Sequence, residues 1–204
     1  MAGLKPLRNA AKRKVADFRY RWLQDWVFVH INKTGGTSVG KALNIRLDHR
    51  SALELIEALG RPTWDRKFSF AFVRNPWDKV VSQYHYRART AQAGFEAGPP
   101  PFPEWAVRTF AERDPAFYDR PRMFRPQMDW VADETGEVVV GFIGRFETLD
   151  ADFQEVCRRI GRTASLPHLK ASPHAPYRTY YDDESRDAVA KHFARDIAAF
   201  GYDF

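Results

Sequence analysis

Apolar residues form two short continuous runs, each followed at once by a segment with helical spacing. The runs cover 26–31 and 67–73 and are rich in aromatic and β-branched residues. Such runs are typical of strands buried on both faces of a parallel sheet. Strands that alternate with helices indicate an α/β fold with a central parallel sheet.

Helices are expected wherever apolar residues recur at intervals of three or four. Ser51 and Asn75 are suitable N-caps for two of them, and Pro76 suits a first turn. A hairpin is predicted around 134–136, with strand-like arms at 127–133 and 137–146. Proline- and glycine-rich loops are expected at 90–103 and 166–181. The predicted helices cover 37–47, 52–59, 76–89, 103–113, 148–160 and 183–200.

Residues 1–25 differ from the rest because basic and apolar side chains alternate in them. We predict a basic N-terminal helix over 1–25 and one domain over 26–204. Two interpretations of the helix stay open. It contacts a membrane surface or a polyanion, or it is a solvated helix whose apolar residues pack on the domain.

Composition limits the class of protein and its partners. The chain has 204 residues, of which 44% are hydrophobic and 15% aromatic, so it can bury a sizeable core. A net charge of +6 favours anionic partners without choosing among them. The single Cys157 allows no internal disulfide and is expected to be a buried small hydrophobe. With no run of about 20 apolar residues and no signal-peptide pattern, a cytoplasmic protein is expected.

The segment after the first apolar run has the residues of an anion-binding turn. Gly35 and Gly36 allow a ligand to approach the main chain, Thr37 and Ser38 suit a helix start, and Lys33 adds a positive charge. An ordinary strand-to-helix turn is the simpler alternative. The spacing from Gly35 to Gly40 and Lys41 nearly fits the ATP-binding loop, but Ala42 replaces the hydroxyl residue that would hold magnesium. A nucleotide-dependent kinase is therefore disfavoured.

Two motifs together resemble one family. HINKTGGTS at 30–38 resembles the 5′-phosphosulfate loop of sulfotransferases that use 3′-phosphoadenosine 5′-phosphosulfate (PAPS), especially the heparan sulfate 2-O-sulfotransferase-like carbohydrate branch and its short bacterial relatives. FAFVRNPWDKVVSQYHYR at 70–87 resembles the 3′-phosphate element of that family. IGRFETLDADF at 143–153 and the segment 177–204 are also similar to it. The resemblance implies a P-loop NTPase-like, three-layer α/β fold.

The resemblance also implies roles for individual residues. Lys33 would neutralise charge at the 5′-phosphate and the bridging oxygen, and Arg74 with Ser82 would bind the 3′-phosphate. The segment 166–178 resembles a part of the family that covers the cofactor. The family needs no metal, and the sequence offers no convincing metal cluster. The implied cofactor-binding residues are Lys33, Thr34, Gly35, Gly36, Thr37, Ser38, Arg74, Ser82, Lys170 and Ser172.

The acceptor hydroxyl must lose a proton, for which histidine is suited near neutral pH. His49 is the first candidate because it follows the first helix, as a histidine-bearing segment does in the family, although the spacing is shorter here. His85 is the competitor, and His30 is expected to be structural. Each could instead be a surface or packed residue.

We therefore predict in-line transfer of a sulfuryl group from PAPS to a hydroxyl of a carbohydrate or other polyhydroxylated acceptor. Two alternatives remain, a P-loop kinase and a non-catalytic polyanion-binding module. Nucleic acid is not expected as a partner, and the N-terminal helix is the expected place of any peripheral membrane contact. Gly141 and Lys170 depart from the family pattern, and this affects the acceptor more than the cofactor.

Overall fold

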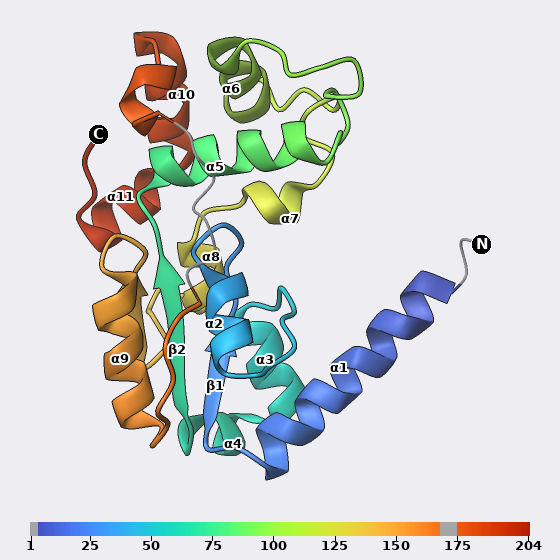
Figure 1. Ribbon diagram of the computed structural model, residues 1–204, viewed down its shortest axis with the longest axis vertical. Coiled ribbons are helices and arrows are strands. Elements are labelled where there is room, and N and C mark those ends of the chain that lie inside the picture. The colour runs from blue at the N-terminus through green and yellow to red at the C-terminus, as the bar shows by residue number, and fades with distance from the viewer. Residues whose placement is uncertain (1–3, 168–174) are drawn as a thin grey trace. The chain divides into compact units, whose positions relative to one another are not determined.

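The computed structural model describes residues 4–167 and 175–204, which form two compact units (Figure 1). Unit 1 consists of the described residues of 4–73 and 130–167, and unit 2 of 74–129 and 175–204. The chain therefore leaves the first unit after a strand and returns to it later. We describe each unit by itself, and one domain over 26–204 stays a prediction.

The sheet of unit 1 has three parallel strands, β1 (Trp26–Val29), β2 (Phe68–Val73) and β3 (Phe142–Arg145), in the order β1-β2-β3. All four residues of β1 are buried, although alternate side chains point to opposite faces. Both faces of the sheet are therefore covered. The predicted α/β class with a central parallel sheet is confirmed.

Helices of unit 1 cover this sheet. On one face, Phe28, Phe70 and Phe72 pack with residues of two helices, including Val39 and Phe153. Cys157 lies buried in the same cluster, as predicted, and its burial raises the pKa of the thiol. The helices of unit 1 are α1 (Leu4–Trp22), α2 (Gly36–Ala42), α3 (Ala52–Leu59), α4 (Arg61–Asp65) and α9 (Leu149–Arg159).

Unit 2 is helical and has an aromatic core. Trp105, Phe110 and Phe193 lie in this core with Trp77 and Tyr84 of the first helix of the unit. Asn75 caps that helix by accepting a hydrogen bond from the N–H of Trp77, as predicted. The elements of unit 2 are α5 (Pro76–Arg89), α6 (Phe102–Phe110), α7 (Pro121–Phe124), the 3-10 helix η1 (Tyr177–Tyr180), α10 (Asp183–His192) and α11 (Ala194–Phe200).

The predicted hairpin is wrong. Its second arm contains β3, which pairs in parallel with β2, and its first arm contains the short helix α8 (Met128–Val131). Of the predicted hairpin, the described residues keep the turn, which one antiparallel bridge between Ala132 and Val138 closes. The reason is tertiary, because the carboxylate of Asp196 accepts hydrogen bonds from the N–H groups of Gln127 and Met128, where α8 begins.

The helices predicted over 37–47 and 183–200 do not run without interruption. The helix expected over 37–47 ends at Ala42, and Asn44 then adopts a left-handed conformation with φ of 50°. This turn places Leu47 against Gly40, where an added Cβ would lie 2.8 Å from the leucine side chain. The last predicted helix is broken at Phe193, whose side chain is buried in the core of unit 2.

Candidate functional site

The loop between β1 and α2 is held in shape mainly by its own backbone and by Thr34. Lys33 and Gly35 both have left-handed backbones, with φ of 66° and 82°. The hydroxyl of the buried Thr34 donates to the carbonyl of Ile31 at 3.0 Å. The N–H of Ser38 donates to the carbonyl of Gly35 at 2.9 Å. The Thr34 hydroxyl and the Ser38 N–H thus both bond to main-chain carbonyls at the loop.

The two glycines of this loop are required for different structural reasons. Gly35 has a conformation that favours glycine, and a Cβ there would lie 2.6 Å from Leu149. At Gly36 the cause is space, because an added Cβ would lie 2.1 Å from Cδ2 and Nε2 of His30. The imidazole of His30 therefore lies directly against the main chain of the loop.

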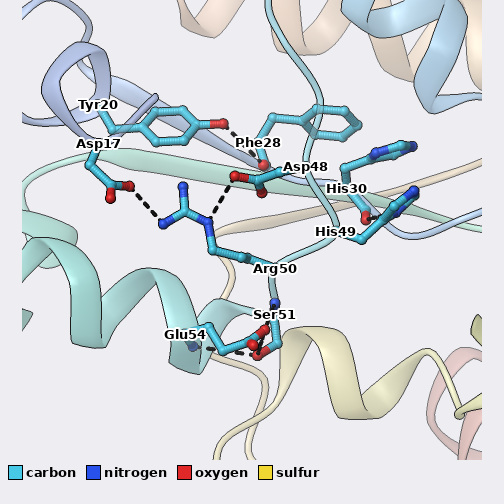
Figure 2. Close-up of polar contacts among 9 residues, drawn as sticks. All are labelled: Asp17, Tyr20, Phe28, His30, Asp48, His49, Arg50, Ser51 and Glu54. Carbon is cyan, nitrogen blue, oxygen red and sulfur yellow. Dashed lines mark hydrogen bonds and ion pairs between the residues drawn. The ribbon is translucent and has the colours of Figure 1, made fainter. Parts of the chain in front are cut away.

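His30 in turn positions His49, the residue predicted to be the base. The two rings are stacked, with centroids 4.3 Å apart and planes inclined by 25°, and Figure 2 shows them side by side. Nδ1 of His49 lies 3.3 Å from the carbonyl oxygen of His30. A carbonyl can only accept, so Nδ1 carries the proton of this hydrogen bond. In the neutral ring the lone pair that can take a proton is therefore on Nε2.

Burial keeps His30 uncharged. The pKa of His30 is lowered to about 3, mainly by burial and also by the neighbouring His49, while a backbone hydrogen bond with Asp48 opposes both. His30 is thus neutral near pH 7. It acts as a packing group there, which agrees with the structural role expected from the sequence.

The segment that carries His49 is fixed on both sides (Figure 2). The buried Arg50 donates from Nε to Asp48 at 2.9 Å and from a terminal nitrogen to Asp17 of α1 at 2.6 Å. Ser51 begins α3 with a reciprocal capping box, in which its N–H donates to Glu54 at 2.8 Å. The position of His49 therefore depends on residues from α1, α3 and the end of β1.

Arg74 and Ser82 belong to unit 2. Nε and one terminal nitrogen of Arg74 lie 2.9 Å and 2.8 Å from Oδ2 of Asp78. The side-chain amide of Gln127 accepts from the N–H of Arg74 and donates to its carbonyl, both at 2.9 Å. Ser82 is buried on α5. The guanidinium is thus held in place by one carboxylate, and its main chain by one amide.

Two buried ionisable groups lie in the same unit as Arg74 and Gln127. Neither was predicted from the sequence. Asp196 fixes the backbone at Gln127, and burial raises the pKa of its carboxyl group. Burial lowers the pKa of Lys79 on α5 to about 8. Sequence reasoning missed Asp196 and Gln127, and likewise Asp17 and Arg50 in unit 1. These partners are far apart in sequence, and no local pattern links them.

The remaining predicted residues have different outcomes. Nε2 of His85 lies 2.9 Å from the hydroxyl of Tyr180 in unit 2, so its ring already has a polar partner. Lys170 and Ser172 lie outside the described residues. In the part of the chain that is described, no group of three or more His, Cys, Asp and Glu side chains could hold a metal ion.

Fold and loop together define an α/β protein with a glycine-rich, lysine-bearing turn after its first strand. The family model of the sulfotransferase family matches residues 23–203, and the chain belongs to this family. An uncharacterized protein of Archaeoglobus fulgidus is 31% identical over 111 residues, which are 53% of this chain and 79% of that protein. A crystal structure of a sulfotransferase from Alicyclobacillus acidocaldarius aligns with 17% identity over 96% of this chain and 94% of that one, at a TM-score of 0.39.

Proposed function

We propose that this sulfotransferase uses PAPS as donor and a hydroxyl group of a carbohydrate or other polyhydroxylated molecule as acceptor. The observation that carries the proposal is the contact between loop and histidine pair. His30 packs against Gly36 of the phosphosulfate-like loop, and His49 stacks on His30 with Nδ1 protonated. A lysine for the leaving group and a base for the acceptor are thus carried by connected elements of one unit.

The reaction follows from the groups present. The acceptor oxygen attacks sulfur in line with the bond to the bridging oxygen, and its proton passes to Nε2 of His49. The bond between sulfur and the bridging oxygen breaks, and its electron pair remains on the 5′-phosphate of 3′-phosphoadenosine 5′-phosphate. Lys33 stabilises the charge that develops there. Alignment and charge stabilisation carry most of such catalysis, as in phosphoryl transfer.

The residues that contact the rest of the cofactor are proposed from the resemblance to the family. Arg74 and Ser82 are proposed to bind the 3′-phosphate, and Lys170 and Ser172 are proposed as further contacts. The ion pair between Arg74 and Asp78 supports this role. Two nitrogens of the guanidinium contact one carboxylate oxygen, which fixes the plane of the group. A guanidinium has five N–H donors, so others remain to bind a phosphate. The acceptor class is likewise a proposal from the resemblance.

Calorimetric titration with 3′-phosphoadenosine 5′-phosphate tests the donor, with and without EDTA. We expect binding that EDTA leaves unchanged, and much weaker binding of adenosine 5′-phosphate, which lacks the 3′-phosphate. Lys41→Ala is the matched control, since Lys41 is an exposed residue of α2 that follows the loop. Absence of binding, or binding that requires magnesium, contradicts the proposal, and the second result supports a kinase.

A further inference from the structure

Helix α1 presents two chemically different faces, and its inner face is attached to unit 1. The buried Tyr20 donates from its hydroxyl to the carbonyl of Phe28 at 3.4 Å. Asp17 forms an ion pair with the buried Arg50 at 2.6 Å. Both contacts are drawn in Figure 2. The orientation of the last turns of α1 is thereby fixed.

The outer face is apolar and exposed. Val15, Phe18 and Trp22 are separated by three and four positions, so they form one stripe along the helix. Their exposed fractions are 54%, 57% and 70%, and the following Leu23 is 65% exposed. Large apolar side chains gathered in this way mark a surface that interacts with something.

Charge around this stripe is almost entirely positive. α1 contains seven basic residues and one acidic residue, Asp17, whose carboxylate faces Arg50. At 100° per residue, Lys14 and Arg19 flank the stripe on its two sides. Exposed apolar residues bordered by basic ones are the pattern of a helix that lies in the interface of an anionic membrane.

A recess continues the apolar surface next to the stripe. It is small, with a volume of about 30 Å³, and lies between α1 and the segment after α2, with Val15 and Ile45 among its apolar lining residues. Arg19 and Arg46 also line it, and Arg19 donates to the carbonyl of Asn44 at 3.4 Å. The basic border of the stripe therefore continues from Arg19 to Arg46.

We propose that α1 attaches the protein peripherally to an anionic membrane surface, with the stripe of Val15, Phe18 and Trp22 in the lipid interface. None of the described helices is long and apolar enough to cross a membrane. A nucleic acid would satisfy the basic residues but leave the stripe in water. A second copy on the same stripe would bring Lys14 and Arg19 close to the same two basic residues. An anionic lipid surface satisfies both features.

Co-sedimentation with vesicles tests this attachment independently of sulfuryl transfer. We expect the full chain to bind vesicles of phosphatidylglycerol and phosphatidylcholine, and to bind pure phosphatidylcholine at least about tenfold more weakly. The double variant Phe18→Ser/Trp22→Ser should lose at least about tenfold in partitioning. Arg13→Glu/Lys14→Glu should lose at least about fivefold and reduce the salt dependence.

Val138→Ser is the matched control, since Val138 is 43% exposed in unit 1 outside α1. It should bind vesicles like the unaltered chain, and all variants should keep the same melting temperature. The proposal is overturned if both vesicle types bind equally or if the stripe variant partitions normally. It is also overturned if sedimentation equilibrium shows a dimer that this variant dissociates, or if the chain binds heparin and no vesicles.

Discussion

The two strand-to-helix connections of this chain, after β1 and after β2, have the same local topology and different chemistry. The first is shaped by its backbone, with left-handed Lys33 and Gly35 and with Gly36 packed against His30. The second is shaped by side chains, with Arg74 held by Asp78 and Gln127. An anion at the first would meet main-chain N–H groups, and at the second a fixed guanidinium.

This difference predicts different sensitivities to substitution. Around the first connection, function depends on volume and on the stacked histidines, because His49 is placed by contacts with His30. At the second connection, function is expected to depend on the charge of Arg74. Three tests can break this comparison, and their expected effects decrease from the first to the third.

The first test asks whether His49, which lies beside the first connection, is the catalytic base. His49→Ala should lower kcat by about 10² to 10⁴, the usual contribution of general base catalysis. Affinity for 3′-phosphoadenosine 5′-phosphate should be unchanged, as measured by calorimetry. His85→Ala is the control, because Nε2 of His85 already contacts Tyr180, and it should have little effect on kcat. Near-normal turnover of His49→Ala would remove this residue from the mechanism.

The second test compares the cations of the two connections. Lys33→Ala should lower kcat at saturating PAPS by about 10² to 10³, because it removes charge stabilisation in the transition state. Arg74→Ala should act mainly on KM. Since loss of Arg74 leaves Asp78 without its cation, Arg74→Ala/Asp78→Asn is measured beside it. Equal losses of kcat at both connections would refute this division of roles.

The third test concerns the packing of Gly36. Gly36→Ala should lower the free energy of unfolding by about 1 to 3 kcal/mol, because the new Cβ overlaps the His30 ring. Urea unfolding measures the loss. In the double variant His30→Ala/Gly36→Ala the overlap is absent, so its loss should be smaller than the sum of the two single losses. Additive losses would show that the ring does not constrain this glycine.

Local features were the part of the fold that could be predicted. The two first strands, the caps at Ser51 and Asn75, and the glycine loop were all predicted because each depends on neighbouring residues. The hairpin prediction failed because Asp196, far along the chain, binds the backbone where α8 begins. The pairing of β3 with β2 is equally non-local.

The sequence by itself determined the α/β class and the family, because these rest on short motifs and on hydrophobic periodicity. Only the tertiary structure decided which nitrogen of His49 carries the proton, why Gly36 is a glycine, and which face of α1 is exposed. These properties depend on contacts between residues distant in the chain, such as Asp17 with Arg50, and no local pattern encodes such contacts.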